Sequence, residues 1–325
     1  NLGKSREEIL AFMRKYAGAG GNVLFDGTDI LSSSAKMDFP RMSKTKLGGF
    51  AEAVNVMMAF STSRMLPVYY RLLRGNVKDI TSFLTSVDEF GDTSMTIIGD
   101  KGFFSKSNIA ELDKRKLKYI IALRRSTSGI NYSRFNNHSS EGHFFYAERL
   151  IKYCTQTIDG HSVYLYHDAK HAAEEETDYL RRVDNGIHEK YTMETYALKV
   201  PQFGTLAVMV SDGVSAKDAF DNYKSRCEVE QEIDVLKTDL DALTSYMQDN
   251  DRLEGWMFVN FIALHIFYMV RKQIVENNLT SKMSTREAIR ILCRQRIVRL
   301  DNEWKKAEAS AKDKAILEAL GVSIT

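Results

Sequence analysis

Apolar residues in the first 124 positions follow two spacings that alternate along the chain. Residues 9–16 and 80–87 repeat apolar side chains every three or four positions, which is typical of a helix that buries one face. Residues 108–116 are expected to form a further helix, and the Ser-rich stretch 31–47 is expected to be a long loop. Short apolar or aromatic runs predict buried strands at residues 22–30, 53–60, 65–73, 94–104 and 118–124. The pattern therefore predicts an α/β layer with a sheet of mixed direction.

The composition changes between residues 125 and 204. Six of the seven histidines lie here, together with many Ser, Asn and Tyr residues. Residues 144–154 and 162–167 have strand character and are joined through Asp159 and Gly160, a dipeptide common in hairpin turns. A charged helix and a closing strand are expected to follow, at residues 169–182 and 205–210. We therefore expect a separate, mainly β insertion domain over residues 125–211.

The stretch from Ser215 to Leu240 has no Gly or Pro and is predicted to be one uninterrupted helix. At about 100° per residue, four polar residues fall within one arc of roughly 60° on this helix. They are Tyr223, Arg226, Glu230 and Lys237. An apolar stripe of similar width runs beside them, formed by Val229, Ile233, Leu236 and Leu240. The helix can therefore bury one face and hold a polar edge at its border, whereas Glu228 and Glu232 point away from that edge.

The C-terminal part is expected to be helical. The most apolar run, residues 256–270, is interrupted by Asn260 and His265 and is too short to span a bilayer, so we expect no membrane partner and a buried helix over residues 253–277. A later helix begins at Ser284 and aligns Arg286, Arg290 and Arg294. This arginine stripe is either a solvated face or a contact with a DNA backbone.

Composition limits the function without identifying it. The chain has 325 residues, 44% hydrophobic and 27% charged, with only 3 Pro, which is typical of a folded globular protein. Its net charge of +2 means that any binding of nucleic acid must depend on local basic surface and on metal ions. The 3 Cys residues are far apart and suggest neither a disulfide framework nor a zinc site, so a reducing cytoplasm is expected.

Three carboxylates are the candidate chemistry. Asp26 and Asp100 close two predicted strands, and Glu230 lies on the polar edge of the predicted helix. Three such groups would repel one another unless cations lie between them, and Mg²⁺ prefers oxygen ligands of this kind. Two Mg²⁺ ions, for which Mn²⁺ could substitute, would activate a nucleophile and stabilise a leaving oxygen in phosphoryl transfer. We therefore predict Asp26, Asp100 and Glu230 as metal ligands and catalytic residues, and Tyr223, Arg226 and Lys237 as DNA phosphate contacts.

Four motifs in order resemble those of the DDE transposases in the superfamily named after insertion sequence 4. Residues 25–28 (Phe-Asp-Gly-Thr) match the first motif, and residues 98–103 (Ile-Gly-Asp-Lys-Gly-Phe) match the second Asp motif. Residues 66–70 (Leu-Pro-Val-Tyr-Tyr), with the following Gly75, Asn76 and Asp79, match the second-strand region. The spacing Tyr-x2-Arg-x3-Glu-x6-Lys at residues 223–237 is similar to the third motif, in which the Glu is the third catalytic carboxylate.

This resemblance implies an RNase H-like α/β fold, a mixed sheet flanked by helices. A mainly β insertion would precede the catalytic-Glu helix, and the C-terminus would be helical. The expected parts are an N-terminal helix and linker (1–21), the first part of the core (22–124), the insertion (125–211), the second part of the core (212–278) and the C-terminal region (279–325).

The resemblance also implies a function: a transposase of a bacterial-type insertion sequence that cuts and joins DNA. The partners would be double-stranded DNA, both the terminal inverted repeats of the element and its target, and a second copy of the chain when assembled on DNA. The protein would act at the nucleoid in a bacterial or archaeal cytoplasm. Alternatives are an RNase H-like nuclease without strand transfer and a non-catalytic DNA-binding descendant. The three retained carboxylates argue against a non-catalytic descendant.

Two features depart from the family pattern. Some relatives stack a Trp of the insertion on a flipped base, but Trp256 and Trp304 both follow Glu230 here. Nothing before Asp26 is long enough for a helix-turn-helix with its own core. We therefore expect this chain alone to bind DNA weakly, with strong salt dependence, and specific end recognition to reside in a segment N-terminal to it.

Overall fold

A computed structural model describes residues 5–44, 49–76, 79–91, 94–135, 140–186, 190–300, 303–307 and 310–321. Its centre is a mixed sheet in which β1 (Gly21–Leu31) pairs antiparallel with β3 (Phe50–Ser61) and parallel with β5 (Met95–Gly99). The strand β4 (Leu66–Arg74) pairs with β3, and β6 (Lys118–Ala122) pairs parallel with β5. The order β4-β3-β1-β5-β6, with an antiparallel side and a parallel side, confirms the predicted RNase H-like fold.

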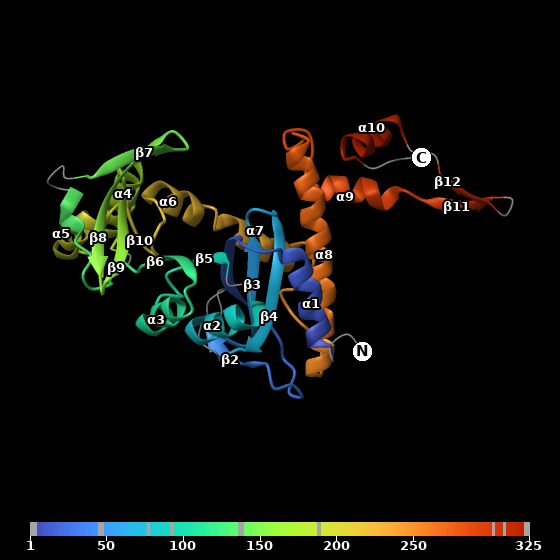
Figure 1. Cartoon of the computed structure of the whole chain (residues 1–325), viewed down its shortest axis with the longest axis horizontal. Helices are drawn as coiled ribbons and strands as arrows, with labels where there is room; N and C mark the ends of the chain where they lie inside the picture. Colours follow the sequence, from blue (N-terminus) through green and yellow to red (C-terminus); the bar gives the residue numbers. More distant parts are fainter. Residues whose placement is uncertain are drawn as a thin grey trace.

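Helices cover both faces of this sheet because neighbouring residues of a strand point to opposite sides. On β4, Tyr69 packs against Phe90 of α2 (Asp79–Phe90), whereas Tyr70 packs against Phe261 of α8 (Asn250–Glu276). The helix α1 (Arg6–Ala17) lies beside α8, and Figure 1 shows the two running along the same side of the sheet. By length and composition α8 could cross a membrane, but 44% of its most apolar window is buried in the protein.

The strands of the insertion continue the same sheet, and the division of the chain into domains stays a prediction. The strand β10 (Thr205–Val210) pairs with β6 on one side and with β9 (His161–Asp168) on the other. The strands β8 (Arg149–Ile158) and β7 (Gly142–Tyr146) extend this edge, and α4 (Ala169–Asp184) and α5 (Met193–Lys199) accompany them at one end of the molecule (Figure 1). The mainly β character is as predicted, and the boundaries at 125 and 211 stay a prediction.

Three local predictions were wrong for identifiable reasons. The expected loop 31–47 contains β2 (Arg41–Lys44), a short polar strand that forms because the long strand β3 offers it an edge. The expected single strand 144–154 is divided between β7 and β8 by a turn in which Ala147 and Glu148 both have positive φ, without the Gly or Asn that normally marks such a turn. The C-terminal region contains helices α9 (Thr285–Arg294) and α10 (Ala311–Ala319), but also the strand pair β11 (Ile297–Leu300) and β12 (Glu303–Lys306).

The predicted helix 215–240 is two helices, α6 (Ala216–Lys224) and α7 (Cys227–Thr238). The break has a local cause at Ser225, whose hydroxyl donates to the carbonyl oxygen of Asn222 at 2.6 Å. This side chain competes for backbone partners, and the Arg226 amide instead donates to the carbonyl of Tyr223, three residues back. The joint therefore places Arg226 between two helices. The third core helix, α3 (Lys106–Lys114), lies before β6 as predicted.

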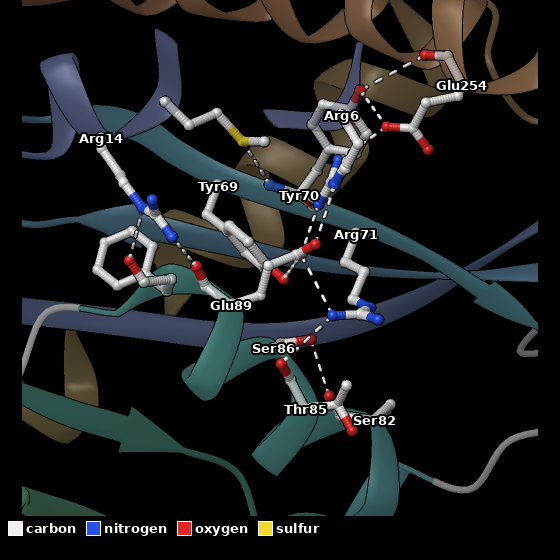
Figure 2. A network of polar contacts seen from close by, with 12 residues as sticks. Arg6, Arg14, Tyr69, Tyr70, Arg71, Ser82, Thr85, Ser86, Glu89 and Glu254 are labelled. Atoms are coloured by element: carbon white, nitrogen blue, oxygen red, sulfur yellow. Dashed lines mark hydrogen bonds and ion pairs between the residues drawn. The ribbon is translucent and has the colours of Figure 1, made fainter. Parts of the chain in front are cut away.

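A network of charged groups fastens α1 to the sheet (Figure 2). Arg6 donates to both carboxylate oxygens of Glu89 on α2, at 3.1 and 2.7 Å, and to Glu254 on α8 at 2.7 Å. The hydroxyls of Tyr69 and Tyr70 donate to the same two carboxylates, at 2.6 and 2.8 Å. Burial alone would raise the pKa of Glu89, but the bonds from Arg6 and Tyr69 hold that pKa below its usual value.

We expect Arg6→Gln to destabilise the protein because it leaves Glu89 and Glu254 partly buried without their shared cation. The loss should be about 3 kcal/mol at neutral pH, measured by urea unfolding. Because the folded-state pKa of Glu89 is lowered, the stability it contributes is present at neutral pH and is lost as the pH falls through that pKa. The difference between variant and wild type should therefore narrow in acid.

Lys15→Gln is the matched control, since Lys15 is an exposed residue of the same helix and forms no ion pair within the described part of the chain. An Arg6→Gln variant as stable as wild type would contradict the role assigned to the network.

Candidate catalytic site

The parallel pairing of β1 with β5 brings two of the predicted carboxylates together. Phe25 lies opposite Gly99 in the register, so Asp26 and Asp100 follow at neighbouring positions of adjacent strands. Adjacent strands lie about 4.8 Å apart. The sequence predicted that Asp26 ends its strand, but β1 continues to Leu31 along β3. It lies instead where the partner strand β5 stops, and this leaves the sheet edge open beside it.

Arg226 lies between Asp100, which follows β5, and Glu230, the third predicted carboxylate. Its guanidinium lies 2.8 Å from Glu230 Oε1 and 3.9 Å from Asp100 Oδ2. The hydroxyl of Tyr223 donates to Asp100 Oδ1 at 3.4 Å. Burial lowers the pKa of Arg226, but the surrounding acidic groups, Asp26 among them, outweigh this and raise it. Arg226 is thus the cation that offsets the repulsion among the carboxylates in this arrangement.

The donor set fits Mg²⁺ in kind, because Asp26, Asp100 and Glu230 supply carboxylate oxygens. Their arrangement is not a closed metal cage: among the described residues, no group of three His, Cys, Asp or Glu side chains is close enough to hold an ion. Arg226 lies between Asp100 and Glu230, and half of the Glu230 side chain is exposed. Binding of a metal by all three carboxylates therefore requires Arg226 to turn away from them.

The other predicted positions differ in their surroundings. Lys237 lies in the last turn of α7 and is not among the residues that line the cavity of Tyr223, Arg226 and Glu230. Glu228 does point away from the site and lies 3.7 Å from Arg271 of α8. Glu232 also points away but is fully buried, and neither of its carboxylate oxygens has a hydrogen-bond partner within the described residues. Burial raises the pKa of Glu232 well above its usual value. Glu232 is therefore a core residue, and a substitution there cannot serve as a surface control for Glu230.

Sequence reasoning missed the residues that line the rest of this cavity, which has a volume of about 440 Å³. Arg149 comes from the start of β8, Asp168 and His171 from the start of α4, and Lys224 from the last turn of α6. Burial lowers the pKa of Lys224, and the cations of Arg149 and Arg226 lower it further against the opposing effect of Asp168. Only Lys224 had a signal in the sequence, its place beside Tyr223.

The comparison with protein families agrees with the interpretation of the motifs. A family model described as "Transposase DDE domain" matches residues 21–266, which include Asp26, Asp100, Glu230 and the whole insertion. No curated protein sequence matches the chain. One similar solved structure is a piggyBac transposase synaptic complex with hairpin DNA, with a TM-score of 0.44 and 11% identity. The similarity covers 88% of this chain and 55% of that one.

Arg226→Gln is expected to lower the free energy of unfolding by about 2 kcal/mol, since it removes the ion pairs with Glu230 and Asp100 and leaves both carboxylates without a compensating cation. Urea unfolding in metal-free buffer measures the change. Arg290→Gln provides the control, because Arg290 is exposed on α9 and forms no ion pair with any described carboxylate. Equal midpoints for Arg226→Gln and wild type would show that the guanidinium does not offset the carboxylate charges.

Proposed function

The chain belongs to the transposase DDE domain family, and from this premise we propose that it cuts and joins DNA at the ends of a bacterial-type insertion sequence by two-metal-ion phosphoryl transfer. Membership of this family supports a transposase that acts on DNA. The observation that supports the chemistry is the register that sets Asp26 beside Asp100, with Glu230 joined to Asp100 through Arg226.

In this proposal Asp26, Asp100 and Glu230 hold the metal ions. Bound Mg²⁺, or Mn²⁺ in its place, would supply activation of the attacking oxygen and stabilisation of the leaving oxygen at a phosphodiester. Arg226 leaves Glu230 and donates to a DNA phosphate, where a planar guanidinium can form two parallel hydrogen bonds. Tyr223 keeps Asp100 oriented through its hydroxyl, and Lys237 contacts the backbone farther from the cut.

The proposed partners follow from the reaction. Cutting both ends of an element and joining them to a target needs double-stranded DNA with terminal inverted repeats, a target duplex and two active sites. We therefore propose a homodimer assembled on DNA. The three cysteines, all free thiols, are compatible with a reducing bacterial or archaeal cytoplasm as the place of action.

The variants Asp26→Asn, Asp100→Asn and Glu230→Gln should each reduce Mg²⁺-dependent cleavage of the element's end DNA at least roughly a thousandfold, equivalent to about 4 kcal/mol in the barrier. Each keeps the shape of the side chain and removes the charge that binds metal, so circular dichroism should remain that of wild type. Strand transfer, assayed with pre-cut ends, should be lost together with cleavage.

Glu228→Gln is the matched control on the same helix, and it should cut and join normally because Glu228 faces Arg271. Full activity of Glu230→Gln would rule out its role as the third ligand. Wild-type cleavage without any strand transfer would instead favour the nuclease alternative.

A further inference from the structure

Two cavities with shared lining residues lie side by side near the catalytic carboxylates. The first is the 440 Å³ cavity between α6 and the insertion, and the second, of about 580 Å³, is lined by the end of β6, the residues after it and β10. Thr205, Leu206 and Tyr223 line both. We call the combined hollow the basic trough. Because Tyr223 also donates to Asp100, the trough adjoins the catalytic edge.

The acidic residues of the trough are already paired. Asp168 lies 3.2 Å from Arg149, and Glu230 lies 2.8 Å from Arg226. The remaining lining carboxylate, Glu175, lies 2.8 Å from Arg125. Each of the three acids in the lining is thus matched by an arginine that also lines the trough.

Four further cations line the trough, and none forms an ion pair with a carboxylate in the described ranges. They are Lys101, Arg124, Lys199 and Lys224. They come from segments far apart in the chain: the turn after β5, the residues that follow β6, the end of α5 and the end of α6. The lining therefore has an excess of four positive charges, although the whole chain carries a net charge of only +2.

Positive charge concentrated in a concave surface attracts polyanions more strongly than the same charge spread over the protein. The size of the trough restricts which polyanion can enter. The major groove of DNA is about 12 Å wide, and the whole duplex is about twice that width. A duplex therefore cannot enter cavities of about 440 and 580 Å³, whereas one sugar-phosphate strand can. A basic groove that follows a single strand usually carries aromatic side chains on which bases stack, and the partly exposed Tyr223 lines both cavities.

We propose that the basic trough binds the backbone of one unpaired DNA strand and leads it past Tyr223 to the catalytic carboxylates, with Lys101, Arg124, Lys199 and Lys224 as phosphate contacts. This inference rests on the proposed function, because it takes DNA as the polyanion. It assigns binding residues outside the Tyr-Arg-Glu-Lys signature, and it gives the insertion a role as one wall of the strand path.

The test is a variant in which Lys101, Arg124, Lys199 and Lys224 are all replaced by Gln. Equilibrium binding is measured by fluorescence anisotropy in EDTA, over a series of salt concentrations, with forked DNA that carries an unpaired strand and with the matching duplex. Each lost contact to a single strand should reduce the slope of log K against log salt by about 0.7, so the slope on forked DNA should fall by about 3. The reduction should be smaller on the plain duplex.

The control replaces four other exposed lysines by Gln, namely Lys15, Lys116, Lys118 and Lys282, none of which lines the trough. Both variants lower the net charge by the same four units, so a difference between them reports position and not total charge. Lys118 lies at the opposite end of β6 from the trough. If the fourfold variant unfolds, the pairs Lys101/Arg124 and Lys199/Lys224 should each remove about half of the slope change.

An unchanged slope in the trough variant, or an equal change in the control, would overturn the proposal. Equal losses on forked and duplex DNA would overturn the single-strand assignment. If the wild-type protein still cleaves DNA in these cases, only the role of the basic trough would be rejected. A wild-type chain that neither binds nor cuts DNA would reject the proposed function as well.

Discussion

The site depends on one constraint, the parallel pairing of β1 with β5. The pairing ends at Phe25 and Gly99, and the residue that follows each of them in the chain is an aspartate. Asp26, Asp100 and Glu230 lie close together, so their negative charges repel one another unless a cation lies among them. Arg226 supplies that charge, and the rest of the site is arranged around it: Tyr223 on one side of Asp100 and Glu230 on the next turn of helix.

Arg226 lies at the break between α6 and α7, where the bond from Ser225 to Asn222 interrupts the helical hydrogen-bond pattern. The helix α6 then packs near the insertion side of the sheet, and α7 buries Val229 and Leu236 against β1 and β3. A residue at such a joint can change partners without unfolding either helix. This is the change that metal binding by all three carboxylates requires of Arg226.

The sequence was sufficient for the parts of the fold and site that depend on local pattern. The strand runs around Asp26 and Asp100 are apolar and short, and the helical spacing after Cys227 correctly places Val229, Ile233 and Leu236 in the core. The break at Ser225 was not predictable, because Ser is tolerated in helices and its bond to Asn222 appears only in three dimensions. Similarly, the joining of β10 to β6 and the convergence of Lys101, Arg149 and Lys224 depend on contacts between distant segments, which leave no periodic signal.

The central claim is that Asp26, Asp100 and Glu230 form one metal-binding site once Arg226 turns away. The most direct measurement is anomalous diffraction from crystals of the protein grown with Mn²⁺. Our account predicts metal peaks within about 2.0–2.2 Å of carboxylate oxygens of Asp26 and Asp100, with Glu230 completing the ligand set and the Arg226 guanidinium removed from both carboxylates. Metal bound elsewhere, with Arg226 still joining Asp100 to Glu230, would contradict it.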